Sequence, residues 1–302
     1  MTGSVQPGSV QPDSWHAWLL ATRPKTLPAS VAPVILGWAV ASLSAPTSPL
    51  LGLTCLAVAV FLQIAANLAN DYFDARSGVD RADRLGPIRV TQAGLLRPGQ
   101  VLAALVVCLV LAMAAGIFAA SQVGWWLLGL GGACIVGAVA YTAGPFPLAR
   151  LGLGELAALV FFGPVACTGT FAVLAGEPTL TAWIAGLIPG LHAAAIMAVN
   201  NLRDVESDQR AGKVTLAVRL GERRARVLAL ALVVLGNLTV APLARLSGHP
   251  WVFLSLLLIP ISWPLLQGIL RTPISRALNG ILARTGQWEL LTCAITAGLL
   301  LL

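Results

Sequence analysis

Charged residues are scarce in this sequence. Asp, Glu, Lys and Arg together make up 10% of the 302 residues, whereas 57% are hydrophobic and the mean hydropathy is +0.84. An ordinary soluble domain carries about 25% charged residues, so this composition excludes that class and favours a polytopic helical membrane protein. With spans of roughly 20 residues and short connections, a chain of this length holds about nine transmembrane helices.

Paired cysteines and a secretory leader are also missing. The five cysteines all fall in apolar runs and none belongs to a Cys-x-x-Cys pair, which excludes a zinc knuckle and a disulfide framework. Residues 1–14 contain no basic segment ahead of an apolar core, so they are not a signal peptide. They are polar and repetitive, and we predict a disordered tail at 1–14 followed by one membrane domain at 15–302.

Long apolar runs divide the rest of the chain into nine predicted spans. In order they cover residues 27–43, 50–70, 100–120, 124–143, 154–174, 180–201, 226–243, 251–269 and 287–302. Residues 271–286 are predicted as a connecting segment that is helical in part. The predicted fold class is all-α: a polytopic membrane protein made of a single bundle of nine transmembrane helices.

The few charged residues are distributed unevenly around these spans. Of the 19 Lys and Arg residues, Arg245 falls on one side of the predicted topology and all the others fall on the side of the N-terminus. The positive-inside rule therefore places the N-terminus in the cytoplasm. Because the net charge of +7 is spread over alternate loops, it indicates orientation in a lipid bilayer and argues against a nucleic acid partner.

Acidic and amide side chains gather where predicted spans two and six reach the cytoplasmic side. Within each cluster they are spaced three or four residues apart, so that each set lies on one face of a helix. The members are Asn67, Asp71 and Asp74 around the end of span two, and Asn200, Asp204 and Asp208 around the end of span six. Carboxylates at the edge of a bilayer are costly and usually functional. Their oxygen atoms are ligands that Mg²⁺ prefers, so the pattern predicts a site for divalent metal and a phosphorylated substrate.

Each of these features also has a simpler explanation. An Asp at the end of a span is often a solvated helix cap or the partner of a nearby Arg, and only the matching spacing of both clusters on one side favours a metal site. Basic residues follow both clusters, where guanidinium groups can hold phosphate oxygens. The segment from Tyr141 to Arg150 is either a plain Pro/Gly turn or a third part of this site. His192, in the middle of span six, is predicted to be a buried, hydrogen-bonded histidine and not a metal ligand.

Taken together, these residues resemble the UbiA-type intramembrane prenyltransferases. The two Asp-rich motifs, the nine helices and the segment Tyr141-x-x-x-Pro-x-Pro-Leu carry the resemblance, which extends from about residue 15 to the end. Phe73 departs from the family pattern, which more often has Gly there, and leaves the metal-ligand candidates intact. Three stretches are similar to the branch of the family that acts on 1,4-dihydroxy-2-naphthoate in menaquinone biosynthesis. They are Arg23–Pro28, Asp83–Arg89 and Asn200–Gly221.

The resemblance implies an activity: Mg²⁺-dependent transfer of a polyprenyl group from polyprenyl diphosphate to 1,4-dihydroxy-2-naphthoate, with loss of carbon dioxide, giving demethylmenaquinone. It implies the bacterial cytoplasmic membrane, with the site at the cytoplasmic side, and the six members of the two clusters as metal ligands. The implied catalytic residues are Asp71, Asp74, Asp80, Asp204 and Asp208, with Asp80 handling acceptor protons. The implied substrate-binding residues are Lys25, Arg76, Arg84, Arg89, Tyr141, Arg150, Arg203 and Lys213.

Other functions fit parts of the same pattern. One is a UbiA-type enzyme with a different aromatic acceptor, 4-hydroxybenzoate or homogentisate; the stretch Asp83–Arg89 favours the naphthoate. Another is a transporter or metal channel, which also places carboxylates in a membrane. Alternating access favours polar groups near the midplane, however, and here both clusters lie at one edge. The sequence has no Asp-Gly-x-x-Ala-Arg run, which excludes a CDP-alcohol phosphotransferase.

Overall fold

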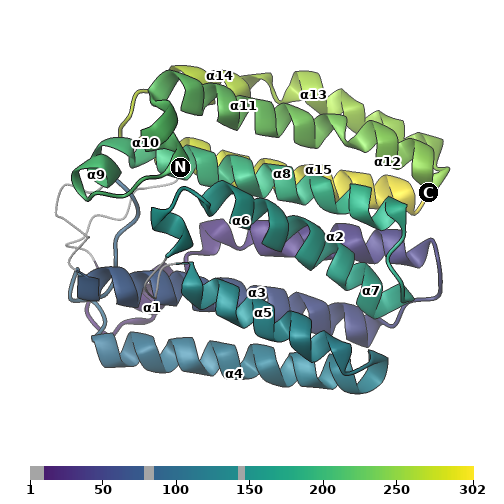
Figure 1. The fold of residues 1–302 in the computed structure, drawn as a ribbon, viewed down its shortest axis with the longest axis horizontal. Coiled ribbons are helices and arrows are strands. Elements are labelled where there is room, and N and C mark those ends of the chain that lie inside the picture. Colours follow the sequence, from purple (N-terminus) through teal and green to yellow (C-terminus); the bar gives the residue numbers. More distant parts are fainter. Residues whose placement is uncertain (1–9, 78–84, 142–146) are drawn as a thin grey trace.

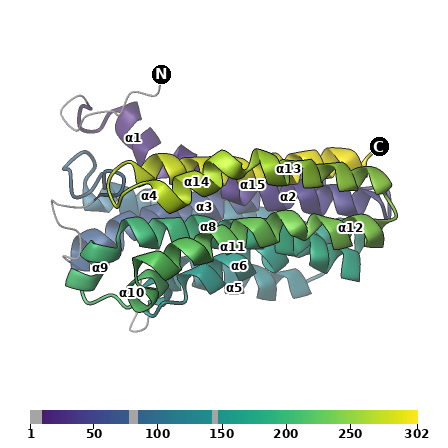
Figure 2. The same ribbon diagram turned by 90° about the horizontal axis from the view of Figure 1, so that it is seen from above.

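The computed structural model describes residues 10–77, 85–141 and 147–302. Within these ranges every regular element is a helix and no strand occurs. The longer helices run side by side along one direction of the molecule (Figures 1 and 2). The predicted all-α class is therefore confirmed for the described part of the chain.

The helical elements are bounded as follows. Up to residue 150 they are α1 (Trp15–Thr22), η2 (Pro24–Thr26), α2 (Pro28–Ser42), α3 (Pro49–Ser77), α4 (Pro98–Val123), α5 (Trp126–Ala140) and η3 (Leu148–Arg150). The remainder are α6 (Gly154–Val160), η4 (Phe161–Thr168), α7 (Gly169–Ala175), α8 (Leu180–Arg203), α9 (Val205–Arg210), α10 (Leu216–Leu220), α11 (Glu222–Leu238), α12 (Val240–Ser247), η5 (Pro250–Leu257), α13 (Leu258–Ile261), α14 (Trp263–Arg271) and α15 (Leu278–Leu300).

Six of the helical segments among the described residues are long and apolar enough to cross a membrane. They are Pro49–Arg76, Pro98–Val123, Gly154–Ala175, Leu180–Arg203, Glu222–Ser247 and Pro250–Arg271. The shorter apolar helices α2 and α5, together with α15, coincide with the other three predicted spans. A multi-pass membrane protein is thus supported, and the count of nine spans stays a prediction.

The start of α15 differs from the prediction. The helix begins at Leu278, whereas the apolar run that marks predicted span nine begins only near residue 287. Arg284 and Gln287 lie in the first part of this helix and interrupt the apolar pattern, so no long apolar run marks where the helix begins. Much of the predicted connecting segment 271–286 is therefore the beginning of α15.

The core of the bundle forms where α2, α8 and α15 meet. Leu36, Ile188 and Leu300, one from each of these helices, are fully buried in the same hydrophobic cluster. α4 lies at the outside, and Val107 on its outer face is 55% exposed. In a bilayer such a face contacts lipid chains, which are as apolar as the side chains, so its exposure needs no covering element.

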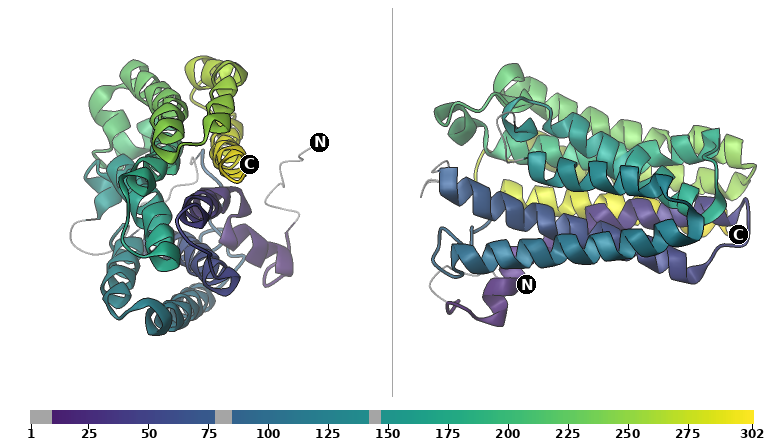
Figure 3. Two further views of the ribbon diagram at one scale, coloured as in Figure 1. Left: turned by 90° about the vertical axis from the view of Figure 1, so that its right-hand side faces the viewer. Right: turned by 60° about the horizontal axis from the view of Figure 1, so that its bottom comes forward.

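The two ends of the bundle differ. α1, α9 and α10 lie at one end and the C-terminus lies at the other (Figures 1 and 2). α1 stands beside the bundle and not within it (Figure 3). Asp13 and Ser14, at the end of the predicted tail, form hydrogen bonds: the Asp13 N–H donates to Leu95 O and the Ser14 side chain caps α1. Residues 1–9 of that tail lie outside the described residues.

Close packing of small residues joins η4 to α8. η4 is a π-helix with Pro164 inside it, an irregularity that often occurs at functional sites. A Cβ atom added at Gly190 would lie 2.6 Å from Leu159 O and 3.0 Å from Gly163 Cα. The two helices can approach this closely only because both contact positions are glycine.

Candidate active site

A cavity of about 400 Å³ lies inside the bundle, bounded mainly by α3, α5, η4 and α8. Its wall on α3 runs from Thr54 to Asp74. At a rise of about 1.5 Å per residue, the cavity follows α3 over roughly 30 Å. Most of this wall is apolar, as at Val58 and Leu62, and the polar side chains gather at the end near α9. The cavity therefore joins a charged end to a long apolar channel.

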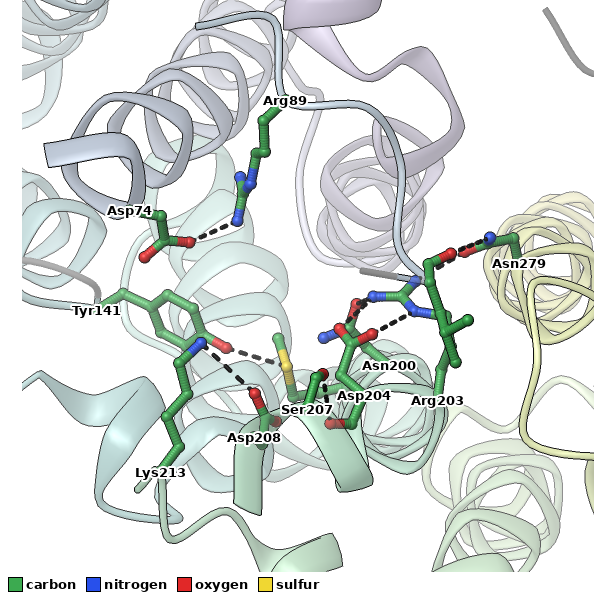
Figure 4. Close-up of polar contacts among 12 residues, drawn as sticks. Asp74, Arg89, Tyr141, Asn200, Arg203, Asp204, Ser207, Asp208, Lys213 and Asn279 are labelled. Carbon is green, nitrogen blue, oxygen red and sulfur yellow. Dashed lines mark hydrogen bonds and ion pairs between the residues drawn. The ribbon is translucent and has the colours of Figure 1, made fainter. Parts of the chain in front are cut away.

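Asp74 and Arg89 form one side of the charged end. The Arg89 Nη2 atom lies 2.5 Å from Asp74 Oδ2, and both side chains are largely buried (Figure 4). Both residues line the cavity. Asn70, one helical turn before Asp74 on α3, also lines it, and its buried Oδ1 atom has no hydrogen-bond partner among the described residues.

Asp71 points to a different place from the one that its spacing predicts. Its two carboxylate oxygens accept hydrogen bonds from the backbone N–H groups of Val90 at 2.9 Å and Thr91 at 3.0 Å. Asp71 is 2% exposed and is not among the described residues that line the cavity. Its carboxylate holds the segment that carries Arg89, so the cavity face of α3 contains Asn70 and Asp74.

Asn67 lines the cavity, but its amide group serves another contact. The Nδ2 atom donates to Thr22 O at 3.0 Å and to Thr26 Oγ1 at 2.9 Å. These bonds fix η2, the short helix that contains Lys25, and Lys25 also lines the cavity. Asn67 therefore positions one of the basic candidates.

The second cluster is organised by Arg203. Its Nε atom donates to Asp204 Oδ1 at 2.8 Å, and its Nη2 atom donates to Asp204 Oδ2 at 2.5 Å and to Asn200 Oδ1 at 2.9 Å (Figure 4). Asn200 and Asp204 line the cavity, whereas Arg203, which is 1% exposed, lies behind them. A guanidinium in this bidentate geometry fixes the orientation of the carboxylate that it holds.

Asp208 completes this side of the charged end. Its Oδ1 atom lies 3.5 Å from Lys213 Nζ, and both residues line the cavity (Figure 4). The prediction of one continuous helix face from Asn200 to Asp208 is wrong, because α8 ends at Arg203 and α9 begins at Val205. The break at Asp204 turns the chain, and Asp208 still faces the cavity.

Tyr141 and Arg150 reach the charged end from the segments around α5 and η3. The Tyr141 hydroxyl donates to Met197 Sδ at 3.0 Å, and both Tyr141 and Arg150 line the cavity. Arg150 O accepts from the Val214 N–H at 3.0 Å, which ties η3 to the segment that follows Lys213. The functional interpretation of the Tyr141–Arg150 segment therefore gains the shared cavity as support; residues 142–146 within it lie outside the described residues.

Of the remaining candidates that the structure describes, Arg76 is not among the residues that line the cavity. Arg76 is exposed; its Nη1 atom donates to the Tyr72 hydroxyl at 2.9 Å, and its guanidinium carbon lies 5.7 Å from the centre of the Tyr72 ring. Asp80 and Arg84 lie outside the described residues.

His192 is buried as predicted: its Nδ1 atom lies 2.8 Å from Ile188 O, and its Nε2 atom lies 3.2 Å from Asn237 Oδ1.

The sequence interpretation missed several polar residues at the cavity. Asn70 is one; its position four residues before Asp74 could have identified it. Arg23 lines the cavity with a left-handed backbone (φ 51°), a conformation that non-glycine residues adopt rarely and often at functional sites. Asn201 lines it as well and donates from Nδ2 to the buried Glu155 at 2.9 Å. No pattern of spacing in the sequence pairs Glu155 with Asn201.

The oxygen-rich end of the cavity is the candidate place for a metal ion. Among the described residues no three His, Cys, Asp or Glu side chains come close enough together to hold a metal ion. Asp74, Asp204 and Asp208 each pair with a cation instead. The donor chemistry nevertheless suits a hard cation, because three carboxylates face one cavity together with the Asn70 oxygen that lacks a partner in the described chain.

The sequence as a whole matches the UbiA prenyltransferase family over residues 30–277. The chain belongs to this family. Two UbiA-type relatives named 1,4-dihydroxy-2-naphthoate octaprenyltransferase are similar over almost their full length. The protein from Mycobacterium tuberculosis is 36% identical, over 95% of this chain and 97% of its own. The protein from Escherichia coli K12 is 38% identical, over 92% of each chain.

Solved structures of the UbiA family share the fold. A UbiA homologue from Archaeoglobus fulgidus bound to DMAPP and Mg²⁺ superimposes with a TM-score of 0.67, covering 95% of this chain and 99% of that one. Its sequence identity is 16%, so the likeness concerns the fold alone. The helical bundle of this chain therefore has the UbiA fold.

Proposed function

We propose that this chain transfers a polyprenyl group from a polyprenyl diphosphate to 1,4-dihydroxy-2-naphthoate, with loss of carbon dioxide, to give demethylmenaquinol, the reduced form of demethylmenaquinone. The observation that carries the proposal is the similarity to two naphthoate octaprenyltransferases over more than nine-tenths of the chain. The cavity supports it independently, because one charged end and one long apolar channel match the two halves of a polyprenyl diphosphate.

In this proposal the diphosphate lies at the charged end of the cavity. Arg89, Lys213, Arg150 and Lys25 all line that end and supply the positive charge that phosphate oxygens require. Arg23 is added to the candidates because it lines the same space. The isoprenoid tail extends between α3 and α5 towards Thr54, where the walls are apolar. Polar and apolar parts of the substrate thus bind in matching surroundings.

The residues that would hold Mg²⁺ are Asp74, Asp204 and Asp208, with Asn70 and Asn200 as further oxygen donors. We keep Asn67 and Asp71 in the site as residues that hold η2 and the Arg89 segment, since their side chains make those contacts. Bound Mg²⁺ would stabilise the negative charge that develops on the leaving diphosphate. A UbiA homologue of the same fold has been solved bound to DMAPP and Mg²⁺, which supports Mg²⁺ as the metal; the ligand residues are assigned from the cavity of this chain.

The chemistry places clear demands on the chain's own residues. The allylic C–O bond breaks and the diphosphate leaves with its electron pair, after which a ring carbon of the naphthoate supplies the electrons of the new C–C bond. The carboxylate then leaves as carbon dioxide, and the electron pair of its C–C bond restores the aromatic ring. Water would capture the allylic cation, so the reacting carbon must be dry. Phe161 and Val165 of η4 line the cavity and would supply apolar walls that keep water from the cation. The basic residues hold the diphosphate while charge builds on it.

The same proposal covers topology and location. Nine spans, a cytoplasmic N-terminus and a cytoplasmic active site follow from the distribution of Lys and Arg, and the charged end of the cavity lies at the end of the bundle where most of these residues occur. A bacterial cytoplasmic membrane is the matching location, since the relatives compared above are bacterial. The lipid bilayer both supplies the polyprenyl substrate and receives the product.

An acceptor screen tests the function. Purified protein in lipid vesicles is given octaprenyl diphosphate, Mg²⁺ and one of 1,4-dihydroxy-2-naphthoate, 4-hydroxybenzoate or homogentisate, and products are identified by mass spectrometry. We expect prenylated, decarboxylated product from the naphthoate and none from the other two. Product from 4-hydroxybenzoate or homogentisate instead would contradict the acceptor, and metal flux without any product would favour a transporter.

A further inference from the structure

Asn279, in the first turn of α15, joins two segments that are far apart in the sequence. Its Nδ2 atom donates to Leu85 O at 2.8 Å, and its Oδ1 atom accepts from Arg203 Nη1 at 2.8 Å (Figure 4). The orientation of the amide is determined by these partners, because a guanidinium can only donate and a carbonyl oxygen can only accept. One side chain therefore connects the segment after residue 84 with the second acidic cluster.

On one side, Asn279 completes the contacts of Arg203. The other donors of that guanidinium hold both oxygens of Asp204 and the Oδ1 atom of Asn200. Arg203 is 1% exposed, so water cannot replace a lost partner at little cost. If Asn279 loses its oxygen, the buried Nη1 group lacks this acceptor, and Arg203 must shift together with the carboxylate that it orients.

On the other side, Asn279 holds one end of the segment Leu85–Thr91. The far end of this segment is held by Asp71, whose oxygens accept from the N–H groups of Val90 and Thr91. Between these two attachments lies Arg89, which reaches back to Asp74 at 2.5 Å and lines the cavity. The position of Arg89 therefore depends on both attachments.

The side chain of Asn279 does not serve α15 itself. The N-cap of this helix is Ala277, and no side chain forms a capping hydrogen bond there. Asn is also a weaker helix former than Ala, since its amide competes with the backbone for hydrogen bonds. An Ala at this position would favour the helix, so the presence of Asn is explained by the contacts to Leu85 and Arg203.

We propose that Asn279 is a positioning residue of the active site, which ties the Arg89 segment to Arg203 and so keeps the acidic clusters of α3 and α8 in one fixed arrangement around the cavity. The inference rests on the proposed function, because the arrangement that it maintains is the diphosphate site. Asn279 itself touches neither substrate nor metal. It acts through Arg89 on one side and through Asp204 and Asn200 on the other.

Two substitutions separate its two contacts. Asn279→Ala removes both, and we expect kcat to fall about 10- to 100-fold, the range found when a partner behind a metal ligand is lost. The Mg²⁺ concentration for half-maximal activity should rise as well, because Asp204 is no longer held. Asn279→Asp keeps an acceptor for Arg203 and loses the donor to Leu85 O. We therefore expect it to raise KM for the diphosphate while its Mg²⁺ requirement stays near that of the wild type.

A second measurement does not depend on turnover. Arg89 is 6% exposed, so trypsin cannot reach the Arg89–Val90 bond while the segment is held. In vesicles containing EDTA and no substrate, both Asn279 variants should be cleaved after Arg89 at least several-fold faster than the wild type, as identified by mass spectrometry of the fragments. Arg276→Ala is the matched control, because Arg276 is exposed and lies one turn earlier; its kinetics and cleavage should equal those of the wild type.

The outcomes are distinct. Wild-type kcat, KM and cleavage in both Asn279 variants would overturn the positioning role. If Asn279→Ala fails to insert, the nearly isosteric Asn279→Asp variant still decides between a held and a released segment. Faster cleavage in the variants, combined with a wild type that does not prenylate the naphthoate, would support the connection made by Asn279 and reject the proposed function.

Discussion

At the scale of single residues, the candidate active site contains carboxylates that already have cationic partners. Asp204 is the clearest case, since Arg203 holds both of its oxygens and shields it from behind. A buried ion pair of this kind adds little stability in itself, and its loss is costly because the remaining charge is left alone. Its value lies in the fixed direction of the carboxylate towards the cavity.

Replacing Asp204 by Asn tests this carboxylate. The amide has nearly the same shape but lacks the negative charge, so we expect turnover to fall at least about 100-fold, as when a preorganised electrostatic group is removed. The variant should still insert in the membrane, with a lower midpoint of thermal unfolding because the buried Arg203 loses its anionic partner. Product formation in vesicles is the measurement. Arg223→Ala, at an exposed position on α11, is the control and should behave like the wild type; full activity of Asp204→Asn would remove this residue from the site.

Replacing Asn70 by Ala tests the oxygen that lacks a partner in the described chain. If Asn70 Oδ1 is a metal ligand, the Mg²⁺ concentration for half-maximal activity should rise about 10-fold, whereas KM for the naphthoate should change little. Gln122→Ala, at an exposed position near the end of α4, provides the control. An unchanged Mg²⁺ requirement in Asn70→Ala would show that this oxygen has another role.

Comparison of Asn70 with Asp71 shows what spacing alone can predict. Two members of the predicted cluster, Asn67 and Asp74, line the cavity. The sequence could not tell which neighbouring residue shares their face, since Asp71 is drawn away by the N–H groups of Val90 and Thr91. Those N–H groups come from a segment nearly 20 residues later. Contacts between residues this far apart in the sequence depend on how the chain packs, so the spacing of residues within one helix does not predict them.

At the scale of helices, the site depends on how closely α8 approaches η4. Gly163, Gly186 and Gly190 lie at the contact, where a Cβ atom at Gly163 would lie 2.6 Å from Gly186 O. Small residues give membrane helices their close packing, because lipid provides no hydrophobic force to press them together. The position of α8 carries over to Asn200 and Asp204, which follow at its end.

Replacing Gly190 by Val should separate these two helices. The added side chain meets the backbone of Leu159 and Gly163, which cannot yield as a flexible side chain would. We expect a loss of about 1–3 kcal/mol in stability, the usual cost of overpacking, and a lower midpoint of thermal unfolding in detergent. Gly298→Ala is the control, because nothing lies within 4 Å of its added Cβ, and its midpoint should stay the same or rise. Equal midpoints for the two variants would contradict the close packing.

Most helices could be predicted from the sequence, and their exceptions have physical causes. Long apolar runs located α4 and α8 within a few residues, because the bilayer demands such runs. α3 begins where predicted and continues to Ser77, about two turns beyond the predicted end at residue 70. The early start of α15 was missed, since its first turns are polar. The break at Asp204 was missed too, because spacing assumes a regular helix. The π-helix η4 leaves no pattern that a count of apolar residues would detect.

At the scale of the whole molecule, the cavity is divided into a charged end and an apolar channel. This division repeats the distribution of charge along the sequence, where the acidic and basic residues gather on one side of the spans. It orients a polyprenyl diphosphate in one direction only. The apolar channel, through its length, should set how much of the tail is enclosed.

Replacing Gly131 by Leu should shorten this channel. Gly131 of α5 lines the cavity and has nothing within 4 Å of an added Cβ, so a larger side chain can enter the apolar part without disturbing the wall. We expect turnover with octaprenyl diphosphate to fall several-fold and turnover with geranyl diphosphate to stay near that of the wild type. Gly129→Leu is matched to it, since Gly129 has equal space and is not among the described residues of the cavity wall. A similar fall with both substrates would place the tail elsewhere.

The pairing of Asp74, Asp204 and Asp208 with Arg89, Arg203 and Lys213 has a consequence for the order of events. Diphosphate that binds alone must separate a basic side chain from its carboxylate, which leaves the carboxylate charge unpaired. Mg²⁺ that binds alone must separate a carboxylate from its basic side chain, which leaves the positive charge unpaired. When Mg²⁺ and diphosphate bind together, the carboxylates pair with the metal and the basic side chains pair with the phosphate oxygens, so no charge is left unpaired. Metal and diphosphate then enter as one neutralised unit, each raising the affinity for the other by the same factor.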